Sequence, residues 1–231
     1  RGLDKETYCD TLLEGGATAG KAPVPPTLDF GFDELKDENA YDPDGAKALL
    51  EEAGYKDTDG DGFVETPSGE KLELNFVIYT SREELNVYAQ AAQASLKDIG
   101  INVKLNTVSY ETLLDMRDSG EFDMLIWNVL VANTGDPEKY LRENWYSTSS
   151  SNQMGYSNPQ VDELLDQLVT EFNEDTRKNL IMQIQQLIMD DAATVFFGYE
   201  TTYLFSSKSV TGVKMYPMDY YWLTKDISLA E

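Results

Sequence analysis

Residues 72–105 constrain the fold most, because they change from the periodicity of a strand to that of a helix and back. In residues 72–79, leucine, phenylalanine and isoleucine occupy every second position, which predicts a strand with one buried face. Residues 82–99 carry apolar side chains at helical spacing, and Gly100 ends that helix. Residues 101–105 alternate again. A strand, a helix and a strand in this order predict a right-handed parallel crossover.

The rest of the chain continues the alternation of helices and strands. The apolar run of residues 122–127 is nearly continuous, which predicts a central strand covered on both faces. The whole pattern predicts an α/β fold with a mixed sheet flanked by helices. The other predicted elements are helices at the chain start to about residue 18, at 42–54 (begun by Asp42-Pro43), 110–117, 158–172 and 174–190, and strands at 194–199 and 202–205.

Composition excludes several classes of function. The 231 residues hold 42 acidic and 18 basic side chains, and the net charge of −24 would repel the phosphates of a nucleic acid. The sequence has no histidine, so a histidine-based catalytic triad and a histidine-ligated zinc site are both excluded. Cys9 is the single cysteine, and we expect it to be a packed residue. No spacing singles out a catalytic acid pair, so we predict no enzymatic activity.

An acidic loop begins at Asp57 and has the spacing of a calcium-binding loop. Asp57, Asp59, Asp61 and Glu65 stand at positions one, three, five and nine, with a glycine at position six. Ser68 stands where position twelve requires a glutamate. Because aspartate and glycine also form tight turns unaided, the loop is either structural or a calcium site. Calcium is the only cofactor that the sequence leaves open.

The loop that follows the predicted strand at 122–127 is the candidate ligand site. Ligands of α/β sheets bind beyond the carboxyl ends of the strands, which is where residues 127–137 emerge. Instead of contacting a ligand, Trp127 could be a core residue of the strand. Asp136 could instead cap the helix that begins at Pro137.

Four motifs in order along the chain resemble the family 5 extracellular solute-binding proteins, the oligopeptide, dipeptide and nickel receptors of ABC importers. They are Tyr41-Asp42-Pro43 through Ala53-Gly54-Tyr55, the acidic loop, Gly120 through Trp127, and Gly135-Asp136-Pro137. The resemblance implies a lobe of the type II periplasmic-binding-protein-like fold. It also implies a second, C-terminal lobe at residues 1–191 and a hinge-return segment at 192–231 that packs toward an upstream lobe.

The resemblance also implies a site and its partners. Peptide-binding members place an aspartate against the ligand's amino terminus where this chain has Asn133, so recognition of a free amine is in doubt. Arg117 falls where some relatives carry an arginine near a ligand carboxylate, although a solvent-facing role is an equal alternative. Because the sequence has no histidine, this lobe cannot supply an imidazole ligand to nickel. The residues expected to contact a ligand are Tyr110, Arg117, Trp127, Asn128, Asn133, Thr134 and Asp136.

The predicted function is therefore capture of a peptide-like solute by hinge closure, for delivery to the membrane permease of an ABC importer. We expect an extracellular or periplasmic protein, anchored through a lipoprotein segment upstream of this chain. The alternative is a calcium-dependent extracellular interaction domain centred on residues 57–65.

Overall fold

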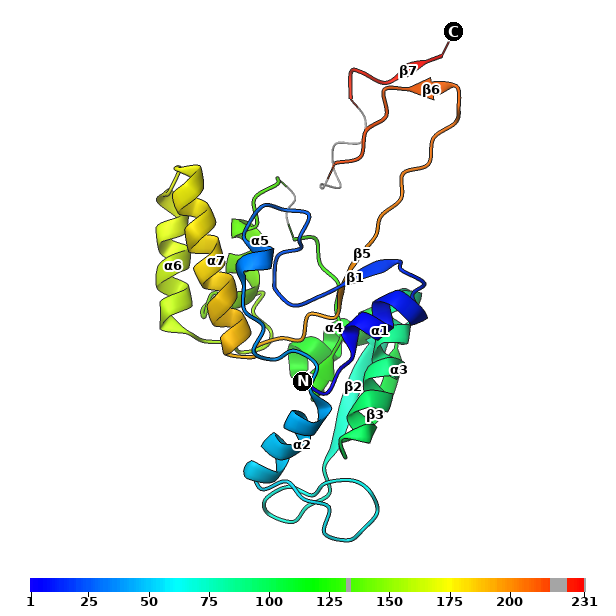
Figure 1. The fold of residues 1–231 in the computed structure, drawn as a ribbon, viewed down its shortest axis with the longest axis vertical. Helices are drawn as coiled ribbons and strands as arrows, with labels where there is room; N and C mark the ends of the chain where they lie inside the picture. The colour runs from blue at the N-terminus through cyan, green and yellow to red at the C-terminus, as the bar shows by residue number, and fades with distance from the viewer. Residues whose placement is uncertain (132–133, 217–223, 231) are drawn as a thin grey trace. The chain divides into compact units, whose positions relative to one another are not determined.

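The computed structural model describes residues 1–131, 134–216 and 224–230 (Figure 1). The chain divides into two compact units. Unit 1 consists of Arg1–Gly20 and Asn39–Asn128, and unit 2 of Lys21–Glu38 and Val129–Glu231. The predicted division into a lobe of residues 1–191 and a return segment of residues 192–231 is a different partition, and it stays a prediction.

Unit 1 is built around a parallel sheet with the strand order β3-β2-β4. Strand β2 (Glu73–Tyr79) pairs in parallel with β3 (Asn102–Val108) along its whole length. Its other edge pairs in parallel with the short strand β4 (Met124–Leu125). Helix α3 (Glu83–Asp98) connects β2 to β3 and packs against both strands, as Figure 1 shows. The parallel pairing predicted for residues 72–105 is confirmed.

Two expectations about these strands were wrong. The strand predicted at 122–127 has only two paired residues and lies at one edge of the described sheet, whereas β2 is central. In β2, the consecutive residues Phe76, Val77, Ile78 and Tyr79 are all buried, so both faces of its second half are covered. A run of apolar residues indicates only that a segment is buried. It does not show whether the segment is a paired central strand or an apolar segment at the edge of the sheet.

The remaining elements of unit 1 follow the predicted start and stop signals. The Asp42 carboxylate accepts a 2.9 Å hydrogen bond from the Gly45 N–H, which confirms the predicted cap of α2. Cys9 is buried, as expected, with its Sγ 3.6 Å from the Tyr88 hydroxyl. The elements are α1 (Lys5–Thr7), the π-helix η1 (Tyr8–Leu12), β1 (Ala17–Ala19), α2 (Pro43–Glu52) and α4 (Tyr110–Ser119).

Unit 2 is mainly helical, and its helices α6 and α7 lie side by side (Figure 1). Leucine and isoleucine side chains from these helices form a core with Tyr140 and Trp145 of α5. Gln185 of α7 is fully buried in this unit; its Oε1 accepts from the Val24 N–H at 3.1 Å, and its Nε2 donates to the Phe30 carbonyl at 2.9 Å. The helices are η2 (Phe32–Glu34), α5 (Glu138–Trp145), α6 (Pro159–Thr170) and α7 (Glu174–Asp190).

The end of the chain forms less regular structure than predicted. Strand β5 covers Gly198–Glu200 only, and the strand expected at 202–205 is absent from this described stretch. Tyr203 and Phe205 are exposed, so the aromatic residues of this stretch do not indicate a strand packed against a core. Strands β6 (Val210–Thr211) and β7 (Ser228–Leu229) pair antiparallel. Predicted aromatic surface at 220–222 lies outside the described residues.

No helix in the described ranges is both long enough and apolar enough to cross a bilayer.

The buried amide of Gln185 gives a direct test of this architecture. Gln185→Leu would leave the buried Val24 N–H and the half-buried Phe30 carbonyl without their Gln185 partners. We expect the free energy of unfolding to fall by about 2–5 kcal/mol in urea denaturation. The control Gln183→Leu changes an exposed side chain of the same helix and should stay within about 0.5 kcal/mol. Equal stability of the two variants would contradict the role assigned to Gln185.

Candidate functional site

A pocket of about 350 Å³ lies at the carboxyl ends of the unit 1 strands. Tyr79 is the last residue of β2, Tyr110 opens the helix after β3, and Trp127 follows β4. Because the three strands run parallel, their carboxyl ends meet at one edge of the sheet, which is the usual position of ligand crevices in α/β folds. The residues that line the pocket are Tyr79, Ser81, Arg82, Tyr110, Trp127 and Asn128.

Three aromatic rings form one wall of this pocket. The ring centroids of Tyr79 and Tyr110 are 5.5 Å apart, those of Tyr79 and Trp127 are 6.0 Å apart, and those of Tyr110 and Trp127 are 5.7 Å apart. These separations are typical of rings that stabilise one another by edge and tilted contacts. Tyr79 is only 3% exposed and supports the cluster, whereas Tyr110 is 41% exposed and offers ring surface to a ligand.

The polar groups of the pocket are linked through the Tyr79 hydroxyl, which donates a hydrogen bond to Asn128 Oδ1. Burial raises the pKa of this hydroxyl, and the charge of Arg82 and a hydrogen bond from it offset only part of the rise. Tyr79 is therefore a protonated donor at neutral pH. The Arg82 guanidinium lies 3.7 Å from the Glu84 carboxylate.

Arg117 supports the pocket without lining it. Its guanidinium carbon lies 5.4 Å from the centre of the Trp127 ring, in cation–π geometry. The same guanidinium donates to Asp118 Oδ1 from Nε at 2.9 Å and from Nη2 at 2.7 Å. Arg117 therefore holds the Trp127 ring in place, and its charge is already paired with Asp118. Arg117 is half-buried, so the solvent-facing alternative is met only in part, and its contact with a ligand stays a prediction.

The structure brings together three of the predicted ligand residues, Tyr110, Trp127 and Asn128, and gives Asp136 other partners. Asp136 Oδ1 accepts from the Glu138 N–H at 2.8 Å, at the start of α5. Its Oδ2 accepts from Nε and Nη2 of Arg177, at 3.0 and 2.8 Å. Both oxygens are thus used within unit 2, which agrees with the alternative capping role, although Pro137 takes the cap position itself.

Two further predicted residues are not among those that line this pocket in the described part of the chain. Thr134 is exposed and belongs to unit 2, whereas the described residues that line the pocket belong to unit 1. Asn133, the residue expected in place of the amine-binding aspartate, lies outside the described residues. Its role stays a prediction.

The sequence analysis missed Tyr79, Ser81 and Arg82. The signal was available, because these residues follow the first predicted strand just as Trp127 and Asn128 follow the third. Ligands bind beyond the carboxyl ends of neighbouring strands, so the position that marks Trp127 marks these three residues as well.

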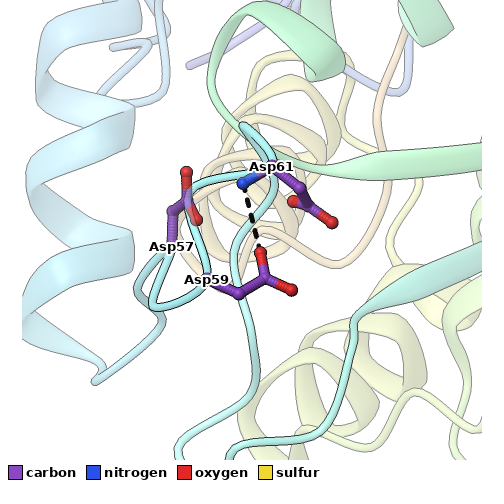
Figure 2. A group of neighbouring side chains, drawn as sticks. All are labelled: Asp57, Asp59 and Asp61. Atoms are coloured by element: carbon purple, nitrogen blue, oxygen red, sulfur yellow. Dashed lines mark hydrogen bonds between the residues drawn. The ribbon is translucent and has the colours of Figure 1, made fainter.

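The acidic loop brings three of its four predicted metal ligands together. Asp57, Asp59 and Asp61 are neighbours in the loop (Figure 2), and one carboxylate oxygen of each lies within 4.8 Å of the others. Backbone N–H groups of the loop already bind them. Gly60 and Gly62 donate to the two oxygens of Asp57 at 2.7 and 3.0 Å, Asp61 donates to Asp59 at 3.1 Å, and Phe63 donates to Asp61 at 2.9 Å. The bonds to Asp59 and Asp61, from N–H groups two residues on, are those of Asx turns, and the bonds to Asp57 close the rest of the loop.

A lysine side chain of the same chain also contacts this loop. Lys71 Nζ lies 2.9 Å from Asp59 Oδ2 and pairs still more closely with Asp61 Oδ2. The hydrogen bond from Lys71 lowers the pKa of Asp61, and that of Lys71 is raised in turn. The fourth predicted ligand, Glu65, is buried and faces the loop from within, where its Oε2 accepts from the N–H and the hydroxyl of Thr58, both at 2.7 Å. Glu65 therefore does not join the three aspartates.

Comparison with known proteins identifies the family. Residues 1–152, which include the whole pocket, match the model described as "Bacterial extracellular solute-binding proteins, family 5 Middle". The chain belongs to this family. The motif resemblance found in the sequence is thus confirmed.

Its relatives include receptors for different solutes. Heme-binding protein A of Haemophilus influenzae is 29% identical over 94% of this chain and 38% of its own length. Di/tripeptide-binding protein 2 of Pseudomonas aeruginosa is 26% identical over 94% of this chain and 39% of its own length. These family 5 relatives are named as binding proteins, which agrees with the prediction that the chain is not an enzyme. The chain spans about two fifths of the length of these relatives.

Solved structures confirm the predicted type II periplasmic-binding-protein-like fold. The oligopeptide-binding protein AppA of Bacillus subtilis, solved with a nonapeptide, matches with a TM-score of 0.80 at 23% identity, over 100% of this chain and 46% of that one. The periplasmic oligopeptide-binding protein of Thermotoga maritima, also solved with bound mannohexaose, matches with a TM-score of 0.77 at 25% identity, over 86% of this chain. Coverage is 40% and 39% of those two Thermotoga chains.

The contacts of Asp136 predict a structural role. Asp136→Ala removes the carboxylate paired with Arg177, whose side chain is only 18% exposed and keeps its bonds to two backbone carbonyls, and it removes the acceptor for the Glu138 N–H. We expect a loss of about 1–3 kcal/mol in the free energy of unfolding, measured by urea denaturation. Asp166→Ala, which removes the 60% exposed partner of Arg142, is the control and should cost less than about 1 kcal/mol. A smaller loss for Asp136→Ala than for the control would refute this role.

Proposed function

We propose that this chain forms the solute-contacting part of a receptor that captures a peptide-like solute and delivers it to the permease of an ABC importer. The observation that carries the proposal is the aromatic pocket at the carboxyl ends of β2 and β4, which lies wholly within the family match. In this proposal an upstream lobe of the same receptor closes over the pocket by a hinge motion. The protein acts outside the cytoplasm, anchored through an upstream lipoprotein segment.

The chemistry of the pocket supports a peptide-like solute. The exposed ring of Tyr110 and the ring of Trp127 offer flat apolar surface to peptide planes and side chains. Ser81 and Asn128 add neutral hydrogen-bonding groups that can orient a polar backbone. Relatives named for di- and tripeptides and for oligopeptides favour the same class. The relative bound to mannohexaose makes a sugar the first alternative to test.

The Trp127 ring provides the test of this proposal. In the complete receptor, solutes are first found by screening peptides, sugars and metal chelates, and affinity is then measured by isothermal titration calorimetry. We expect Trp127→Ala to weaken binding about tenfold or more, because the ring forms the apolar wall of the pocket. Phe172→Ala, which removes an 85% exposed aromatic ring from unit 2, should leave affinity unchanged.

Two results would count against the receptor. One is failure of all three solute classes to bind the complete protein. The other is equal affinity of the Trp127→Ala variant and the unaltered protein for a solute that does bind.

A calcium-dependent interaction domain remains the second candidate. The close approach of the carboxylates of Asp57, Asp59 and Asp61 favours it. Against it stand the ammonium group of Lys71, which a calcium ion would have to displace from Asp59 and Asp61, and the engagement of Glu65 with Thr58. A full calcium loop needs six to eight oxygen ligands, of which these three side chains supply a part.

Thermal melting distinguishes the two candidates. A ligand that binds only the folded state raises the melting temperature, so a functional calcium site must respond to calcium. We expect the same melting temperature in about 5 mM calcium, which would saturate a typical extracellular calcium site, and in about 5 mM EDTA, which would remove bound calcium. A rise of several degrees with calcium that Asp59→Asn abolishes would instead favour the calcium-dependent domain.

A further inference from the structure

Arg177 of α7 holds the end of the loop that follows Trp127. Its Nε and Nη2 donate to Asp136 Oδ2 at 3.0 and 2.8 Å. Its Nη1 donates to the carbonyl oxygens of Leu168 and Glu171 at 2.6 and 2.7 Å. The Arg177 side chain is only 18% exposed. One guanidinium therefore joins the loop to α7 and to the carboxyl end of α6.

The part of the loop beside Asp136 is held firmly by these bonds. Asp136 Oδ1 accepts from the Glu138 N–H at 2.8 Å, so the two oxygens of this carboxylate connect the arginine to the start of α5. Val131, earlier in the loop, packs against the core of unit 2. Thr134, a residue expected to contact a solute, is exposed and is separated from Asp136 only by Gly135. The held segment thus presents an exposed hydroxyl group.

A network of this kind often serves stability alone, and Arg142 is an example in the same unit. Its Nε donates to Glu138 Oε1 at 3.0 Å, its Nη1 to Asp166 Oδ1 at 3.2 Å, and its Nη2 to the Leu165 carbonyl. All three partners belong to α5 and α6. Arg177 differs from Arg142 because one of its partners belongs to the loop itself.

We infer that Arg177 is a positioning residue for the solute, which acts through Asp136 and the loop without contacting the solute. The inference rests on the proposed function and adds a residue that lies outside the pocket lining. A loop that is already held loses less conformational freedom when a solute binds to it, so the held loop gives a higher affinity. The planar fork of an arginine suits this role, because it donates in several fixed directions at once, whereas a lysine would keep only the charge.

The test measures affinity by isothermal titration calorimetry in the complete receptor, with a solute found by the screen of peptides, sugars and metal chelates. We expect Arg177→Lys to weaken binding about fivefold or more, because the released loop must then be ordered when the solute binds. Arg142→Lys is the matched control. It makes the same substitution in the network of α5 and α6 and should leave affinity unchanged.

Hydrogen exchange distinguishes positioning from a general loss of stability. In the free receptor, Arg177→Lys should speed amide exchange in residues 134–138, and solute binding should slow it again. Gln185→Leu removes another buried anchor of α7, whose partners are Val24 and Phe30. We expect Gln185→Leu to lower stability but to change neither affinity nor the exchange of residues 134–138.

Asp136→Asn tests the same link from the other side. It keeps an oxygen for the Glu138 N–H and removes the charge that pairs with Arg177, so it keeps the helix cap if Arg177→Lys fails to fold. We expect the same direction of change in affinity and in exchange. Combining the two substitutions should weaken binding little more than either one, because both break one interaction.

The outcomes separate the inference from the proposed function. Unchanged affinity in the folded variants of Arg177 and Asp136, or an equal loss of affinity in Gln185→Leu, overturns the inference and leaves the receptor in place. Weaker binding with unchanged exchange in residues 134–138 also overturns it, because the loop would then not be the link. Failure of the unaltered receptor to bind any solute overturns the proposed function itself, and the inference with it.

Discussion

The parallel pairing of β2 with its two neighbours determines where a solute can be contacted in unit 1. Parallel strands bring their carboxyl ends to one edge, so the residues after β2, β3 and β4 meet there although they are far apart in the sequence. The burial of Phe76 through Tyr79 fixes β2 in the centre of the described sheet. The Tyr79 ring then supports both Tyr110 and Trp127, and its hydroxyl orients Asn128. The pocket is thus a consequence of strand order.

Much of this arrangement could be predicted from the sequence. The periodicity of residues 72–105 predicted the crossover, Asp42 predicted a helix cap, and ordered motifs predicted the family. Strand order could not be predicted, because β2 and the run at 122–127 are similarly apolar, and pairing depends on partners elsewhere in the chain. Tyr79 and Arg82 follow the first predicted strand, but only the strand order that places β2 beside β4 makes them neighbours of Trp127.

The roles of the acidic residues were hardest to predict, because a carboxylate can serve a ligand, a metal or the fold itself. Asp136 follows the predicted site loop, yet its two oxygens bind Glu138 and Arg177. The aspartates of the acidic loop accept from backbone N–H groups and from Lys71, a residue ten positions beyond Asp61. In both cases a basic side chain that the spacing does not identify already pairs with the carboxylate. In a chain with 42 acidic residues, spacing alone identifies few sites.

The central claim is that a solute lies against the wall formed by Tyr110 and Trp127. The most direct test is a crystal structure of the complete receptor with a solute identified by screening. The account predicts solute atoms within about 4 Å of both rings, the distance of van der Waals contact. A solute bound to the complete receptor without touching either ring would contradict it.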